Sequence, residues 1–109
     1  MANLKIKPLS VNKVWKGKRF KTNDYKSYEQ ELFLLLPKIT IPKGKLKLSL
    51  VFGFSSKASD IDNPVKPFVD ILQKKYLFND KMIYQMEIKK VDVKKGKEFI
   101  DFKIESVFE

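Results

Sequence analysis

The chain has no cysteine and no histidine among its 109 residues. Without cysteine there is neither a disulfide framework nor a thiolate metal site. Without histidine, the commonest general base and the usual zinc ligand are also missing. Any catalysis must therefore depend on carboxylates, lysines or tyrosines, or on a hard metal ion that is bound through oxygen.

Long apolar segments are missing as well. The longest apolar run, Leu32 to Leu36, is far too short to cross a bilayer. Met1 to Pro8 lacks the apolar central region of a signal peptide. The sequence therefore predicts a soluble, cytoplasmic protein without a membrane partner.

Acidic residues are scarce in the first half of the chain. Residues 1–59 hold 13 Lys and Arg against 3 Asp and Glu, whereas residues 60–109 hold 10 of each, and the net charge is +10. Strong basicity favours a nucleic acid or an anionic membrane as partner. A membrane surface would call for a basic amphipathic helix, but the densest basic run, Lys13 to Lys21, reads as a loop.

The remaining composition is that of a globular protein. Hydrophobic residues make up 43% of the chain, and no repeat or low-complexity linker interrupts it. A chain of this length suits one domain with a modest core. We therefore expect a single domain over residues 1–109.

Apolar periodicity in the first half predicts a strand, a loop and a helix. Leu4 to Leu9 alternates apolar and basic residues, as a strand does. Ser10 to Lys21 reads as a polar loop. Thr22 is a suitable N-cap for a helix that continues through Leu36 and ends before a proline. The core-facing residues of this helix are predicted to be Tyr25, Tyr28, Leu32 and Leu35.

The second half predicts a strand, a helix and a final pair of strands. Leu46 to Phe54 alternates most clearly. A helix is expected from about Asn63 to Tyr76, with Val65, Phe68, Val69, Leu72 and Tyr76 facing the core. Tyr84 to Val93 and Phe99 to Val107 read as a hairpin, with a β-bulge at Lys89 and Lys90 where the apolar phase shifts. The order β-α-β-α-β-β predicts an α+β fold, a mixed sheet with two helices on one face.

Carboxylates gather where the middle strand gives way to the second helix. Asp60 and Asp62 are two residues apart, so in an extended segment both would point toward one cation. Asp62, Lys66 and Asp70 are spaced by four and share one stripe of the predicted helix. The free N–H groups at the start of this helix also favour a bound phosphate.

Each of these residues also has a purely structural interpretation. Asp62 or Asn63 could cap the helix, and Lys66 could form ordinary i,i+4 ion pairs with the aspartates on either side. Asp80 could be a turn residue after Asn79. The residue types alone leave both interpretations open.

The central motif resembles that of RusA-type Holliday junction resolvases. Residues 60–66 read DIDNPVK, Asp70 follows four residues after Lys66, and Asn79 and Asp80 come later. The family shows D-x-D-N-x-x-K, a further aspartate, and a D-D pair about twenty residues after the first aspartate. In this chain Asn79 replaces the first acid of that pair, and Met82 stands where a glutamine is usual.

The opening segment is similar to the same family. Residues 8–15 read PLSVNKVW, against the family's P-P-S-x-N-x-x-W, and Gly17, Arg19 and Phe20 follow in a similar basic loop. The resemblance covers residues 4–95, with the same order and spacing of motifs.

The resemblance implies a set of catalytic residues. Asp60, Asp62 and Asp80 match the family's catalytic carboxylates and would bind Mg²⁺, with Mn²⁺ as a substitute. Lys66 matches the catalytic lysine, and Asp70 and Asn63 would support these groups. The chain would then be a structure-selective endodeoxyribonuclease that resolves Holliday junctions by paired nicks, in DNA recombination and repair. It would act on branched DNA as a homodimer, and a phage or prophage origin would suit it.

The basic loop has two interpretations as well. Its cations would contact DNA phosphates or form a solvated face; they are Lys13, Lys16, Lys18, Arg19 and Lys21. Trp15 and Phe20 could stack on exposed bases or anchor the loop to the core. Two other functions stay open for the whole chain, namely a basic DNA-binding or accessory protein without catalysis, and a protein whose basic face binds an acidic partner protein.

Overall fold

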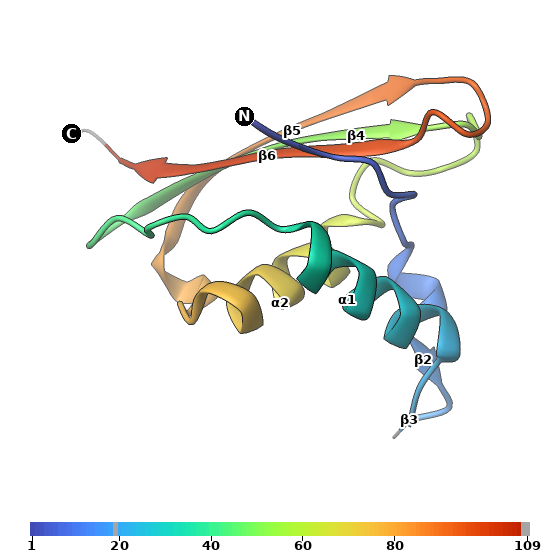
Figure 1. The fold of residues 1–109 in the computed structure, drawn as a ribbon, viewed down its shortest axis with the longest axis horizontal. Helices are drawn as coiled ribbons and strands as arrows, with labels where there is room; N and C mark the ends of the chain where they lie inside the picture. The colour runs from blue at the N-terminus through green and yellow to red at the C-terminus, as the bar shows by residue number, and fades with distance from the viewer. Residues whose placement is uncertain (19, 108–109) are drawn as a thin grey trace.

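A four-stranded mixed sheet with two helices on one face forms the body of the protein (Figure 1). A computed structural model describes residues 1–18 and 20–107. The strand order is β1-β6-β4-β5, with β1 Ala2–Leu4, β4 Leu46–Phe54, β5 Ile83–Asp92 and β6 Phe99–Ser106. The predicted α+β class, mixed sheet and placement of both helices on one face are confirmed.

Strand β4 is the centre of the sheet, with the bounds that the sequence predicted. It pairs parallel with β5 and antiparallel with β6. Its alternate residues Leu46, Leu48, Leu50 and Phe52 are buried. Phe52 and Phe102 both pack against Phe68 of the second helix, with ring centroids 6.1 and 5.8 Å away, so this helix is fixed against the middle of the sheet.

The predicted hairpin between the last two strands is wrong. β5 and β6 are adjacent in sequence, but β4 lies between them. Ile100 and Phe102 of β6 are buried, whereas most residues of β5 are exposed. Burial therefore places β6 inside the sheet and leaves β5 at its edge. The predicted bulge at Lys89 and Lys90 is also wrong, since the pairing there is regular and its irregularity falls between Leu46 and Lys47.

The first strand is shorter and earlier than predicted. It covers Ala2–Leu4 and pairs with β6, and the chain then leaves the sheet. Ile6 and Pro8 remain buried beyond the strand. Beyond Leu4, the alternation therefore marks a segment that covers the core after the chain has left the sheet.

Both helices form where the sequence predicted them. Helix α1, Asn23–Leu35, is capped by Thr22, whose hydroxyl accepts a 3.1 Å hydrogen bond from the Tyr25 N–H. Tyr25, Tyr28 and Leu32 are buried, but Leu35 is 40% exposed and Leu36 takes the inward position beyond the helix end. Helix α2 covers Val65–Tyr76 and buries Phe68, Val69 and Leu72, as predicted.

A small hairpin replaces part of the predicted loop. A 3-10 turn at Val11–Lys13 leads into β2, Trp15–Lys16, which pairs with β3, Phe20–Lys21. Figure 1 shows this hairpin projecting from the body beyond the start of α1. Among the helices of the described residues, none is long and apolar enough to span a bilayer.

Candidate active site

The connection from β4 to α2 carries Asp60 and Asp62 as a turn. The Asn63 N–H donates to the Asp60 carbonyl at 3.3 Å, and the Val65 N–H donates to the Asp62 carbonyl at 3.1 Å. The expectation of an extended segment with both carboxylates on one side is therefore wrong. The ammonium of Lys90 on β5 donates to the Ser59 carbonyl and holds this connection against the sheet edge.

Asp62, Lys66 and Asp80 line one groove between α2 and the edge strand β5. Its volume is about 420 Å³, and its other walls are apolar: Val65, Val69, Ile83, Met86 and Ile88. Three of the four residues that the sequence singled out for catalysis are therefore brought together. Two carboxylates and one ammonium at an open groove form a place where a phosphodiester can meet both a cation and acidic ligands.

Asp80 is held in place by two residues, Asn79 and Gln73. Asp80 begins a short 3-10 turn, Asp80–Met82, whose N-cap Asn79 accepts a 3.0 Å hydrogen bond from the Lys81 N–H through its side chain. The Asp80 N–H donates to the side-chain oxygen of Gln73 on α2 at 2.9 Å. Asn79, which departs from the D-D pair of the family that the motif resembles, therefore caps the turn that presents Asp80.

Lys66 and Asp70 form an ion pair on α2, with 2.9 Å between Nζ and Oδ1. The hydrogen bond that Lys66 donates to Asp70 is the main cause of a raised Lys66 pKa, and the negative charges of Asp70 and Asp80 raise it further. Lys66 is thus a cation at neutral pH. The Gln73 amide lies 3.5 Å from the same Asp70 oxygen, so a chain of contacts connects Lys66, Asp70, Gln73 and the backbone of Asp80.

Sequence reasoning missed Gln73 and Lys90. The i,i+3 spacing of Asp70 and Gln73 on a helix was a signal that the two side chains meet. Lys90 carried no local signal, because its contact with the β4–α2 connection depends on the parallel pairing of β4 and β5.

Asp60 is exposed and does not line the groove. Across residues 1–18 and 20–107, no three acidic side chains lie close enough together to form a metal-binding group. The structure thus brings Asp62 and Asp80 to one place and leaves Asp60 outside it. Two carboxylates nevertheless suit Mg²⁺, which proteins commonly hold through one or two carboxylates together with substrate phosphates and water.

Asn63 lies just before the N-terminus of α2 and contacts the opening motif. The residue at the N-cap of α2 is Pro64, and no side chain accepts a capping hydrogen bond there. The interpretation of Asp62 or Asn63 as a helix cap is therefore wrong. The Asn63 carbonyl accepts a 2.8 Å hydrogen bond from the Val11 N–H, which ties the opening motif to the start of α2.

The cations of the predicted basic loop are distributed over several environments. The Lys21 ammonium lies between the rings of Trp15 and Tyr25, 4.1 and 4.4 Å from their centroids. Lys21 thereby connects the hairpin to Tyr25 of α1, while the Trp15 ring is 49% exposed. Lys16 and Lys18 are exposed, as is Phe20 at 71%.

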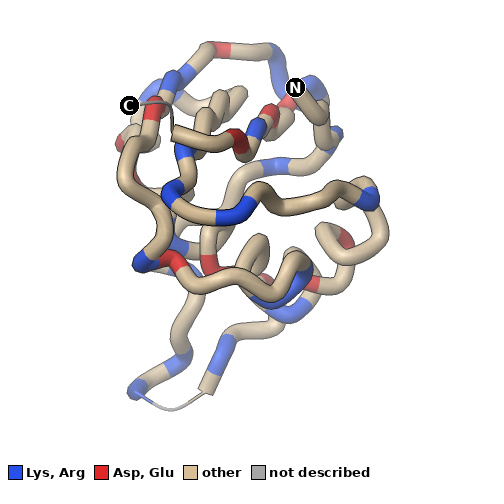
Figure 2. The backbone as a smooth tube through the Cα atoms, turned by 90° about the vertical axis from the view of Figure 1, so that its left-hand side faces the viewer, with Lys and Arg blue, Asp and Glu red and all other residues tan. Residues whose placement is uncertain are grey.

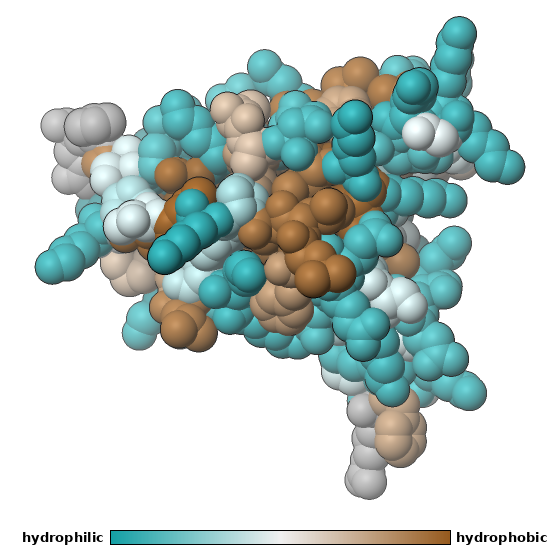
Figure 3. Space-filling model, in the orientation of Figure 1, coloured by the Kyte–Doolittle hydropathy of each residue, from teal (hydrophilic) through white to brown (hydrophobic). Residues whose placement is uncertain are grey.

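Lys13 lines a second cavity, and Arg19 lies outside the described residues. Figure 2 shows lysines on both arms of the hairpin, and Figure 3 shows a largely hydrophilic surface around it. Exposed cations beside an exposed aromatic ring are typical of a nucleic-acid contact surface.

One comparison with known proteins gives a match over most of the chain. The family model described as endodeoxyribonuclease RusA matches residues 6–103. The matched range includes the groove, the opening motif and the projecting hairpin. No curated protein was found to match the chain.

Proposed function

The chain belongs to the RusA endodeoxyribonuclease family, and we propose that it is a structure-selective nuclease that resolves four-way DNA junctions by paired nicks. One observation carries the proposal: Asp62, Lys66 and Asp80, the positions that match the family's motif, line a single groove although eighteen positions separate the first from the last. Recombination and repair of DNA are the setting in which such junctions arise.

The groove is the proposed site of a divalent cation, Mg²⁺ with Mn²⁺ as a substitute. Asp62 and Asp80 would hold it, since both carboxylates line the groove. When bound, Mg²⁺ supplies Lewis-acid polarisation of a phosphate and lowers the pKa of bound water. The lowered pKa of bound water would replace the general base that histidine commonly supplies in other enzymes.

Asp60 is proposed as a third ligand that joins when metal and DNA are bound. It is exposed, and it stands two residues before Asp62 on the same turn. Catalytic contacts are often long in a free enzyme and tighten only in the complex with substrate. A movement of the turn that brings Asp60 to the groove would then complete an all-oxygen donor set.

Lys66 is proposed to stabilise the negative charge that develops on the phosphate. Its pKa is raised by Asp70 and Asp80, so it keeps its proton and is unsuited to act as a base. A positioned cation aimed at the reacting phosphate stabilises the transition state more than the ground state. Asp70 and Gln73 would hold the ammonium and Asp80 in a fixed relation through the contacts described above.

The hairpin and the homodimer complete the proposal. Lys16 and Lys18 would contact phosphates, and exposed Phe20 would stack on a base that the branch point leaves unpaired.

Two copies related by a two-fold axis suit a junction with near two-fold symmetry, and each copy would make one nick. A second copy would supply a second groove of the same kind, placed for the second nick.

Cleavage of a synthetic four-way junction tests this function. Each strand is end-labelled in turn, and the protein is incubated with and without Mg²⁺, beside a linear duplex of the same sequence. We expect nicks at symmetric positions in two opposite strands, only with metal and only in the junction. Binding without cleavage in Mg²⁺ or Mn²⁺ would instead indicate the alternative, an accessory DNA-binding protein without catalysis.

A further inference from the structure

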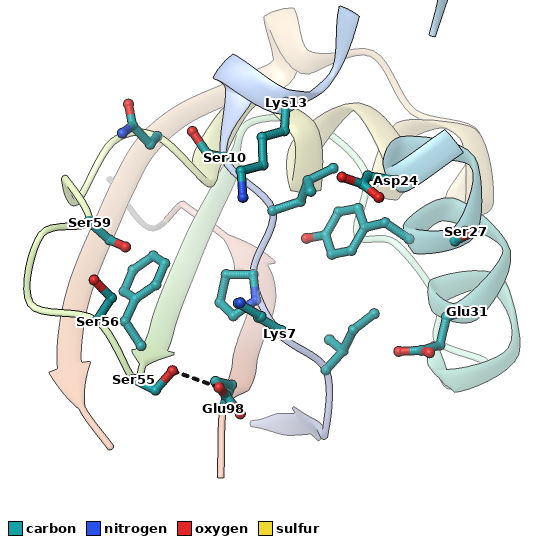
Figure 4. A pocket seen from close by; sticks show the side chains of 16 residues that line it. Lys7, Ser10, Lys13, Asp24, Ser27, Glu31, Ser55, Ser56, Ser59 and Glu98 are labelled. Atoms are coloured by element: carbon teal, nitrogen blue, oxygen red, sulfur yellow. Dashed lines mark hydrogen bonds between the residues drawn. The ribbon is translucent and has the colours of Figure 1, made fainter. Parts of the chain in front are cut away.

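A second cavity lies on the other side of the β4–α2 connection from the groove. Its volume is about 560 Å³, within the range of small-ligand sites. It is lined by the opening motif, the first half of α1 and the end of β4, and its polar lining includes Lys7, Ser10, Lys13, Tyr28, Ser56 and Asn63. Figure 4 shows Ser10, Ser56 and Ser59 along one side, and Asp24, Ser27 and Glu31 of α1 along the other.

The hydroxyl of Tyr28 is a buried polar group without a partner in this cavity wall. Tyr28 is 6% exposed, and its oxygen has no well-aligned hydrogen-bond partner among the described residues, although the Leu9 backbone lies close enough to act on its pKa in the lowering direction. Burial dominates and raises that pKa, so the hydroxyl keeps its proton. A buried donor of this kind costs stability unless a ligand or water accepts its hydrogen bond.

Two serines also present donors to the cavity. The Ser10 hydroxyl accepts from the Asn12 N–H at 3.2 Å, and the Ser56 hydroxyl accepts from the Ala58 N–H at 3.3 Å. Because each oxygen is fixed as an acceptor, its own proton is left to donate elsewhere. Ser55 differs, since its hydroxyl is already bound to Glu98 at 2.7 Å (Figure 4).

The lining fits a planar group that carries both donors and acceptors. Serine and tyrosine hydroxyls would donate, and the carboxylates of Asp24 and Glu31 on the opposite wall would accept. A bare anion would meet those carboxylates unfavourably, whereas a nucleobase offers amino groups and carbonyl or ring-nitrogen acceptors. Phe54 adds a ring surface, and Lys7 and Lys13 suit the phosphates of the same strand.

The cavity and the groove meet at two consecutive residues. Asp62 lines the groove and Asn63 lines the cavity, and the Asn63–Val11 hydrogen bond fixes their common wall. A strand whose phosphate binds at Asp62 would therefore bring a neighbouring nucleotide toward Asn63. We propose that this cavity receives the base of one unpaired nucleotide next to the scissile phosphate, an inference that rests on the proposed nuclease function.

A fluorescent base analogue in the junction tests the proposal. 2-Aminopurine is placed singly at each position around the cut, and its fluorescence, which rises on unstacking, is read on binding without metal. We expect one position beside the scissile phosphate to respond several-fold. Tyr28→Phe, which removes only the hydroxyl, and Ser56→Ala should each weaken that response. Each should also lower the affinity of dissolved deoxynucleoside monophosphates by about three- to tenfold, the loss of one hydrogen bond.

Two controls separate this site from others. Tyr84→Phe removes the same hydroxyl from the exposed edge strand and should change nothing. Phe20→Ala tests the hairpin as the competing site, because the exposed Phe20 ring is itself proposed to stack on an unpaired base. If the only responding position loses its response in Phe20→Ala and keeps it in Tyr28→Phe, the unstacked base lies at the hairpin and the proposal is overturned. Two further outcomes would overturn the proposal and leave the nuclease function standing. In the first, the junction is nicked but no position responds. In the second, the response is unchanged in both Tyr28→Phe and Ser56→Ala. Failure of the wild type to nick any junction would instead contradict the function itself.

Discussion

Lys66 donates a 2.9 Å hydrogen bond to Asp70, one turn further along α2. Lys66 lines the groove that holds Asp62 and Asp80, and its bond to Asp70 both keeps the ammonium charged and fixes its direction. As a surface ion pair alone it would contribute only a few tenths of a kcal/mol to stability. In the proposed mechanism the pair matters because it places a positive charge at the groove.

Replacing Lys66 by alanine should lower the single-turnover cleavage rate by about 10²-fold or more, because one donor to the developing charge is lost. Junction affinity in a gel shift should change little. Lys89→Ala, an exposed lysine of β5, is the matched control. A fall in rate of less than about threefold would mean that Lys66 has no catalytic role and only forms its ion pair with Asp70 on the helix surface.

Replacing Asp62 or Asp80 by asparagine should abolish cleavage in Mg²⁺ and leave junction binding intact or tighter, since a negative charge that repels DNA is removed. Asp60→Asn should have the same effect if the turn closes on the metal as proposed. Asp92→Asn, at the exposed end of β5, serves as control. Cleavage and gel-shift assays on the same preparations separate the two effects. Loss of binding in Asp62→Asn would mean that this residue is structural.

Replacing Lys16 and Lys18 together by alanine should reduce the slope of log affinity against log salt by about two units, one for each phosphate contact. Junction and duplex should be affected alike, because phosphate contacts carry no sequence information. Lys21 is left unchanged because it is stacked between two rings. The control is Lys94→Ala with Lys95→Ala in the β5–β6 connection. An unchanged slope in the hairpin variant would place the DNA elsewhere.

The Glu29–Lys74 pair predicts a pH-dependent stability. Partial burial pushes the pKa of Glu29 upward, but hydrogen bonds from Lys74 and Tyr25 outweigh this and leave it below 4.5. The stabilisation is therefore present above that pH and is lost as the pH falls through the lowered value. Glu29→Gln should lower the free energy of unfolding by about 0.5 kcal/mol at neutral pH. Urea unfolding should show the difference from wild type vanishing in acid, and an equal difference at all pH values would contradict the assignment.

Local patterns in the sequence predicted the elements that are specified by their own residues, through apolar alternation or a capping side chain. The alternation of Leu46 to Phe54 and the cap at Thr22 gave β4 and the start of α1 correctly. The pairing of β5 and β6 was missed because adjacency in sequence favours a hairpin, whereas the buried side chains of Ile100 and Phe102 draw β6 to the other side of β4.

The candidate site was predictable in its residues but not in its geometry. The spacing of Asp62 and Lys66 pointed to one helix face, and the structure adds Asp80 from the far end of α2. The turn at Asp60 and the supporting contacts of Gln73 and Lys90 arise from tertiary packing, which no local spacing encodes.

Cleavage of a supercoiled plasmid that extrudes a cruciform tests the central claim most directly. Two nicks in opposite strands across the junction convert the plasmid to a linear product, whereas one nick gives a relaxed circle. The account predicts that the wild-type protein with Mg²⁺ produces linear DNA and that Asp80→Asn leaves the plasmid supercoiled. Equal linear product from both proteins would contradict the assigned groove, and relaxed circles alone from the wild type would contradict paired nicking.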